Sequence, residues 1–329
     1  MTSKHFVCSL TAMAVLVGLT GMAAAGDDST NWLSAVEKEA QASEGRLNMA
    51  EHVDKPFPVR LGVEYVLATD YIFRGVNFSE YDGEGREDLN HQLSVGAEMD
   101  TEDLAGQDLG KIGGYIWFEW YAGQEHLTPE DSSNLQEVDY VLYWRKEFPE
   151  MFTEVELGWI AYQFPRESGN ARTTYEVYGK LSFDDSPLWE MCGIDVEGPV
   201  LNPFVAYYHD YDVVKGGWLE IGIHHDIDMK NIEQTKDVPV LRDMIFTPSI
   251  VYGVSHRYWD KAMGNESIAT SSANINYGLG VAYDLSSALD IPEQYGKFTV
   301  GGFLNYSQAL DDSLLNDEFY GGMKLGWQW

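Results

Sequence analysis

The feature that most constrains this chain is a strict two-residue alternation that begins at Val59. Up to Phe73 the odd positions are almost all apolar or aromatic, whereas the even positions are small or charged. Successive side chains of a β-strand point to opposite faces, so this period predicts a two-faced strand over residues 59–74. Strands of globular proteins usually have about five or six residues, whereas a tilted strand that crosses a bilayer needs about 9–11. The length therefore favours a membrane strand.

The same alternation recurs along the rest of the chain, with turn signals between the segments. Twelve segments emerge, at residues 59–74, 88–101, 112–123, 136–148, 152–164, 172–184, 200–212, 216–228, 244–256, 272–285, 296–309 and 318–329. Bacterial single-chain membrane barrels have an even number of antiparallel strands. We therefore predict an all-β fold, a transmembrane antiparallel up-and-down β-barrel of about 12 strands that occupies residues 58–329 and keeps both chain ends on the periplasmic side.

The residues before the barrel divide into two parts. Residues 1–25 have the features of a signal peptide, with Lys4 in the positively charged region, an apolar run from Phe6 to Thr20, and small residues up to Ala25. A short membrane anchor is the alternative interpretation of this segment. Residues 26–57 are predicted to form an acidic periplasmic leader, either with a short helix or as a disordered segment. Export and removal of the signal peptide would bring the chain to the outer membrane of a diderm bacterium.

Composition agrees with a membrane barrel and excludes other classes. The formal net charge of −32 excludes a general nucleic-acid binder, which needs clustered basic residues. A soluble sandwich or lipocalin-like barrel also alternates, but its apolar face points inward. The 10 Trp and 20 Tyr residues suit the aromatic girdles of a membrane barrel, and we expect Tyr71 and Phe73 on the lipid-facing side.

The chain ends with alternating apolar residues and a terminal aromatic residue, at Trp327 and Trp329. This ending resembles the C-terminal assembly signal of outer-membrane barrels. The expected partners are therefore the barrel-assembly machinery, outer-membrane lipids and lipopolysaccharide. The sequence leaves the oligomeric state open.

The polar face of the alternating strands is assigned to the barrel lumen. The candidate pore-lining residues are Arg60, Glu64, Asp70, Arg74, Glu119, Asp139, Arg145, Glu154, Glu156, Glu176, Lys180, Glu220 and Asp284. Acids outnumber bases in this set, and rings of carboxylates favour cations. The pattern predicts a porin that passes small polar solutes with a mild preference for cations. The alternative is a structural or adhesion barrel whose lumenal charges pair across neighbouring strands and which does not conduct.

Enzyme chemistry is the alternative from another class. A barrel hydrolase needs a nucleophile, a base and a group that orients the base. His224 and Asp226 share a lumenal face, whereas Ser255 and His256 point to opposite faces because they are adjacent on a strand. We expect no enzyme activity. No phosphate-binding glycine loop or zinc-ligand spacing occurs in the sequence, so no cofactor or metal is expected.

Residues Tyr65–Val76, with the sequence YVLATDYIFRGV, resemble the first-strand signature of the TorF family of outer-membrane porins. In that family a Ser/Thr-Asp/Asn-Tyr-x-Phe-Arg-Gly run leads into a polar loop, which residues 77–80 would form here. The rest of the resemblance is architectural and covers residues 59–329. It implies an outer-membrane porin and supplies no substrate residues. The acidic leader and the longer connections depart from the family. Asp70 and Arg74 lie four residues apart, and we expect them to form an ion pair or share a partner.

Overall fold

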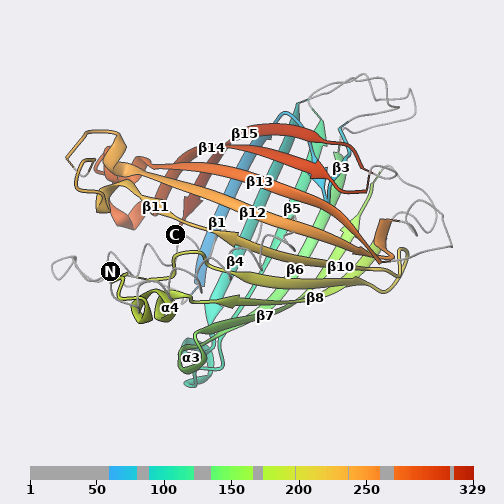
Figure 1. The fold of residues 1–329 in the computed structure, drawn as a ribbon, viewed down its shortest axis with the longest axis horizontal. Helices are drawn as coiled ribbons and strands as arrows, with labels where there is room; N and C mark the ends of the chain where they lie inside the picture. Colours follow the sequence, from blue (N-terminus) through green and yellow to red (C-terminus); the bar gives the residue numbers. More distant parts are fainter. Residues whose placement is uncertain are drawn as a thin grey trace.

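The computed structural model describes residues 59–79, 89–121, 135–165, 173–196, 198–235, 237–259, 270–311 and 315–329. The predicted signal peptide (1–25) and the leader (26–57) lie outside the described residues. Within them, twelve long strands form a closed antiparallel barrel (Figure 1). The strands are β1 (Val59–Ala68), β4 (Asn90–Asp100), β5 (Lys111–Tyr121), β6 (Leu135–Phe148), β7 (Thr153–Gln163), β8 (Thr173–Phe183), β9 (Phe204–Asp210), β10 (Gly217–His224), β12 (Met244–His256), β13 (Thr270–Asp284), β14 (Lys297–Ala309) and β15 (Glu318–Gln328).

Each long strand pairs with the long strands that precede and follow it in the sequence. The ring closes between the first and the last strand, where Val63 of β1 lies opposite Trp327 of β15. A short strand, β11 (Ile227–Asp228), adds to the edge of β12. The predicted up-and-down barrel with twelve strands is therefore confirmed.

The two ends of the barrel differ in their connections. The terminal end, where β1 begins and β15 finishes, carries the short helices (Figure 1). They are α3 (Thr101–Ala105), η2 (Pro149–Met151), α4 (Ser186–Met191), η4 (Met229–Asn231), η5 (Leu241–Asp243), α6 (Leu285–Ala288) and η6 (Glu293–Tyr295). No helix in the described part of the chain is long and apolar enough to cross a membrane. We call the opposite end, where β1 stops, the far end.

Burial along the strands is inverted relative to a soluble protein. Large apolar side chains stand outward on the wall, such as Leu142 of β6 and Met323 of β15, each 61% exposed. The opposite face of the same strands holds charged side chains that solvent does not reach, such as Glu119 and Glu176, both 0% exposed. Fully buried charges are rare in proteins unless they are paired. The alternation predicted from sequence is therefore present, with the apolar face outside.

The first strand is shorter than predicted. β1 ends at Ala68, and residues 69–79 leave the wall and enter the barrel as a hairpin of β2 (Ile72–Phe73) and β3 (Val76–Asn77). Two residues with positive φ make its turn, Arg74 at 50° and Gly75 at 82°. Two-residue hairpin loops favour positive φ at both central positions and glycine at the second. We call residues 69–79 the inward hairpin.

The inward hairpin corrects the expected positions of two aromatic residues. Tyr71 and Phe73 do not face lipid; they pack inside the barrel. The Tyr71 ring centroid lies 5.4 Å from that of Trp117 on β5, and the Phe73 centroid lies 6.1 Å from that of Trp259. The alternation in sequence continues up to Phe73, but the backbone leaves the wall after Ala68. Beyond that point the period no longer predicts which side chains face outward from the barrel.

Candidate functional site

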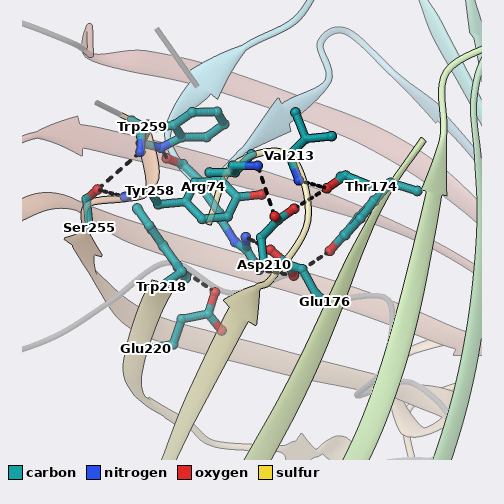
Figure 2. A network of polar contacts seen from close by, with 12 residues as sticks. Arg74, Thr174, Glu176, Asp210, Val213, Trp218, Glu220, Ser255, Tyr258 and Trp259 are labelled. Carbon is teal, nitrogen blue, oxygen red and sulfur yellow. Dashed lines mark hydrogen bonds and ion pairs between the residues drawn. The ribbon is translucent and has the colours of Figure 1, made fainter. Parts of the chain in front are cut away.

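The inward hairpin brings Arg74 into the interior next to β8, on the opposite side of the barrel from β1 (Figure 2). The guanidinium donates two hydrogen bonds to the Glu176 carboxylate, Nη1 to Oε1 at 2.6 Å and Nη2 to Oε2 at 2.9 Å. The Tyr162 hydroxyl donates a third to Glu176 Oε2 at 2.9 Å. Paired, hydrogen-bonded charges of this kind are the form in which proteins bury ions.

Aromatic rings surround the same guanidinium. Its central carbon lies 4.5 Å from the Tyr258 ring centroid, 4.7 Å from that of Phe73 and 4.8 Å from that of Tyr208. A cation within about 6 Å of a ring centroid is attracted by the ring. The Arg74 backbone oxygen also accepts a hydrogen bond from Trp259 Nε1 at 2.9 Å. Side chains from several parts of the chain therefore hold the tip of the hairpin.

Two further connections of the far end contribute to this arrangement (Figure 2). Ser255 Oγ accepts hydrogen bonds from the backbone nitrogens of Tyr258 and Trp259, at 3.2 and 3.3 Å, which directs both residues inward. Asp210 Oδ1 accepts hydrogen bonds from the backbone nitrogens of Val214 and Lys215, at 2.9 and 3.0 Å. We call the inward hairpin together with Tyr258 and Trp259 the plug.

A cavity of about 110 Å³ lies beside the plug within the barrel. Three predicted pore-lining acids reach it, Glu64 from β1, Asp70 from the inward hairpin and Asp139 from β6. Lys324 from β15 is the basic side chain of the lining. The remaining lining residues are Val66, Ala68, Tyr71, Ile72, Gln92, Ser94, Tyr115, Trp117, Val141, Ile160, Tyr162, Asn276, Phe303, Asn305 and Tyr320.

A second charge cluster lies near the terminal end. Arg145 donates two hydrogen bonds to Glu98, Nε to Oε2 and Nη2 to Oε1, both at 2.7 Å. Arg60 donates to Glu98 Oε1 at 3.0 Å and to Asp100 at 2.6 Å. The Tyr143 hydroxyl also donates to Glu98, at 3.0 Å. Glu98, which is 2% exposed, is thus the centre of the cluster.

Two more predicted lumenal acids and one base lie near this cluster. Glu154 lies 4.0 Å from Arg145 Nη1. Glu156 accepts a hydrogen bond from the Tyr178 hydroxyl at 2.8 Å. The Lys180 ammonium lies 5.0 Å from the Phe204 ring centroid.

Of the three remaining predicted pore-lining residues, Glu220 borders the Arg74 site through Trp218, whose ring centroid lies 5.8 Å from the guanidinium carbon (Figure 2). Glu119 accepts a hydrogen bond from Asn90 on β4. Glu220 accepts one from Trp218 Nε1 at 2.9 Å. Asp284 lies at the terminal end, where it forms an ion pair with Lys297 at 3.4 Å.

The expected contact between Asp70 and Arg74 takes another form. Arg74 binds Glu176, whereas Asp70 accepts a hydrogen bond from Asn77 of the same hairpin at 3.3 Å. A four-residue spacing brings two side chains to one face only on a straight strand, and the turn at Arg74 separates the side chains of Asp70 and Arg74. Asp70 reaches the cavity, while Arg74 reaches β8.

Of the suggested hydrolase residues, His224 and Asp226 lie away from the plug, as do the C-terminal tryptophans, whereas Ser255 contacts the plug. Asp226 accepts a hydrogen bond from Thr247 at 2.7 Å, and His224 lies opposite Ser249 in the β10–β12 register. Trp327 Nε1 donates to the Tyr295 backbone oxygen at 2.8 Å, and Trp329 Nε1 donates to that of Gln294 at 3.1 Å. The last tryptophans therefore anchor η6 at the terminal end.

Sequence reasoning missed the aromatic residues of the interior. Trp117, Tyr162, Tyr208, Tyr258 and Trp259 are all buried and form one cluster. The available signal was that Trp117, Tyr162 and Tyr208 have the parity of the lumenal face in their strands. Because large aromatic residues were expected in the membrane girdles, these three residues were not predicted to face the lumen.

The comparisons with known proteins show structural likeness only. No family model and no curated protein matches the chain. Solved structures with a similar arrangement include an outer membrane channel from Pseudomonas putida F1, with 7% identity and a TM-score of 0.45 over 85% of this chain and 100% of that one. LpxR from Salmonella typhimurium shares 13% identity, with a TM-score of 0.44 over 82% of this chain and 99% of that one. The KdgM porin in complex with disordered oligogalacturonate shares 10% identity, with a TM-score of 0.38 over 82% and 98% of the two chains. Similarity at this level carries no argument about function.

Proposed function

We propose that this chain is an outer-membrane porin that passes small polar solutes, with a preference for cations, through a lumen narrowed at the far end by the plug. The observation that carries the proposal is the inverted burial of the wall. Outward residues such as Leu142 and Met323 are apolar and exposed, whereas the interior face is charged. An apolar outer surface of this extent is stable in lipid and is an aggregation hazard in water.

Strand length supports the membrane position. β4, β5, β7, β8 and β15 each have 11 residues. At about 3.4 Å per residue such a strand is about 37 Å long. A tilt of about 40°, usual in membrane barrels, reduces its vertical span to about 28 Å. That height is close to the roughly 25–30 Å of the hydrocarbon core.

The proposed cation preference rests on the cavity. Glu64, Asp70 and Asp139 oppose Lys324 in its lining, so its formal charge is negative. Carboxylates near a narrow aqueous path attract cations and repel anions. The sequence resemblance of residues 65–76 to TorF porins supports the porin function and carries no information about ion preference.

The test is single-channel recording with the purified barrel in planar lipid bilayers. In a KCl gradient we expect small conductance steps. The reversal potential should have the same sign as the equilibrium potential of K⁺. Anion preference would contradict the cation-selective lumen. A barrel that inserts but remains silent, even after residues 70–78 are replaced by a short Gly-Ser linker, would support the structural or adhesion alternative.

Membrane residence and export have separate tests. Outer membranes extracted with detergent should contain a barrel whose gel mobility changes on heating, and its absence would favour a soluble protein. Mass spectrometry of the mature chain should place its first residue at Gly26. A chain that lacks Trp329 should accumulate unassembled if the C-terminal residues are recognised by the barrel-assembly machinery.

The hydrolase alternative is tested with the same material. Incubated with intact phospholipid and lipopolysaccharide, the purified barrel should release no fatty acid. Release that disappears in His224→Ala would establish an enzyme and overturn this part of the proposal.

A further inference from the structure

The cavity beside the plug combines two kinds of lining, acidic and aromatic. Carboxylates reach it from three separate segments, at Glu64, Asp70 and Asp139. Aromatic rings reach it as well, including Tyr71, Trp117 and Tyr162. Asp70 and Asp139 are only 5% and 7% exposed, so these lining residues are largely removed from bulk water.

The lining carries an excess of negative charge and includes a buried acceptor that no described residue satisfies. In addition to the three carboxylates, Asn276 of β13 lines it, and the Asn276 side-chain oxygen is buried and accepts no hydrogen bond from the described residues. The basic side chain of the lining, Lys324, has its ammonium 5.3 Å from the Phe303 ring centroid. A ligand that carries positive charge and several N–H donors would complement this lining.

The aromatic rings narrow the class of ligand. The Tyr71 and Trp117 centroids are 5.4 Å apart, which makes a continuous aromatic surface between the hairpin and β5. Hard metal ions take oxygen ligands and gain little from such a surface, whereas a cation with an alkyl portion gains both from ring faces and from apolar burial.

The cavity volume indicates the size of ligand that fits. A cavity of 110 Å³ holds on the order of ten waters, since one water needs about 10–15 Å³ of such volume. A ligand of up to about ten non-hydrogen atoms therefore fits without movement of the plug.

We propose that this cavity binds a small organic ammonium ion, whose N–H groups donate to Asp70, Asp139 and Glu64 and whose alkyl portion contacts Tyr71 and Trp117. The proposal rests on the proposed porin function, because it names the class of cation that the lumen selects. Asp70 and Tyr71 belong to the inward hairpin, so the bound cation would contact the plug directly.

The experiment is calorimetric titration of the full barrel in detergent with n-butylammonium chloride. Sodium butyrate, of matched size and opposite charge, and sodium chloride are the control titrants. We expect saturable binding of butylammonium only. Asp139→Asn should raise its Kd by about tenfold or more, because a charge-assisted hydrogen bond contributes about 1.5–3 kcal/mol. Glu64→Gln gives an independent test if Asp139→Asn does not yield a barrel with heat-modifiable mobility, and Asp103→Asn on the exposed surface of α3 is the matched control.

The outcomes separate this site from the porin function. Equal binding of butyrate, no saturable binding of butylammonium, or an equal loss in Asp103→Asn would overturn the site. If the barrel conducts K⁺ selectively but neither binds butylammonium nor is blocked by it, the porin function is supported and the ammonium site is refuted. If the barrel does not conduct but binds butylammonium saturably, and Asp139→Asn or Glu64→Gln weakens that binding, the site is supported and the porin function is refuted.

Discussion

The ion pair between Arg74 and Glu176 is the contact on which the position of the plug depends most. Both side chains are buried, with 4% and 0% of their side-chain surface exposed. Glu176→Gln keeps the shape of the side chain but removes its charge, which leaves the guanidinium buried without a counter-ion at hydrogen-bond distance. We predict that this substitution releases the inward hairpin.

The expected magnitude follows from the burial. Removal of one partner from a buried ion pair costs about 3–5 kcal/mol. The rings of Phe73, Tyr208 and Tyr258 still attract the guanidinium, so the lower end of that range is expected. At about 1.4 kcal/mol per tenfold change, a loss of about 3 kcal/mol raises the ratio of undocked to docked hairpin by about 10²-fold.

A cysteine on the hairpin measures that ratio. Val76 lies on β3 and packs against the interior aromatic cluster, so the Val76→Cys substitution places a thiol where the docked hairpin covers it. Its reaction with a membrane-impermeant maleimide scales with the undocked population while docking is fast. We expect Glu176→Gln in this background to accelerate labelling by about 10²-fold, with longer or larger conductance steps in bilayers. Asp108→Asn breaks an exposed ion pair with Lys146, so it should leave the labelling rate unchanged.

A double variant tests the cause. Replacing both charges, as in Arg74→Met with Glu176→Leu, removes the buried ion pair without leaving an unpaired charge, a change that proteins often tolerate. Labelling should return toward the rate of the parent barrel. If Glu176→Gln leaves the rate unchanged, or if the double variant labels as fast as the single one, electrostatic pairing does not hold the plug.

Three other substitutions test the wall and the second cluster. Leu142→Arg places a charge on the outward face and should destabilise the barrel by about 2–4 kcal/mol if that face contacts the middle of the bilayer; an unchanged yield of heat-modifiable barrel would contradict lipid contact. Glu98→Gln leaves Arg145 without its bidentate partner, although Glu154 remains 4.0 Å away, so the loss should lie at the lower end of the range, about 3 kcal/mol, and the temperature at which gel mobility changes should fall; an unchanged temperature would show that the cluster does not stabilise the barrel. Gly113→Ala brings a methyl carbon to 2.3 Å from an aromatic ring on β6 and should cost about 1–3 kcal/mol, whereas Gly280→Ala meets its nearest atom at 3.6 Å and serves as the control; equal effects of the two substitutions would exclude the steric cause.

The wall of the barrel was predictable because lipid imposes one rule on every strand. An outward position must be apolar, and a strand alternates faces at each residue, so the period alone locates β6 or β13 to within a few residues. The same rule explains why Leu142 and Met323 have the outward positions that their parity predicts.

The interior was less predictable because no comparable rule applies there. A lumenal position accepts Glu176, Trp117 or Gly158 equally well, provided that the neighbouring side chains fit. At Gly158 the fit is visible, since an added methyl carbon would lie 2.2 Å from the Tyr178 ring on the next strand. Such complementarity depends on cross-strand register, which the sequence of one strand does not contain.

The first strand shows where these two regimes meet. Its alternation continues past Ala68 to Phe73, but the rule that produces it changes at the far end. Before Ala68 the apolar residues at odd positions, such as Leu61, face outward. After Ala68, Tyr71 and Phe73 are aromatic because they enter an aromatic interior around a buried cation. The turn at Arg74–Gly75 is visible in the sequence as a glycine after a long strand, and the family resemblance implies a polar loop after it, at residues 77–80. What the sequence lacked was the destination of Arg74. An arginine at the tip of a hairpin can be solvated or paired, and only the placement of Glu176 on β8, 102 residues later, decides that the hairpin turns inward.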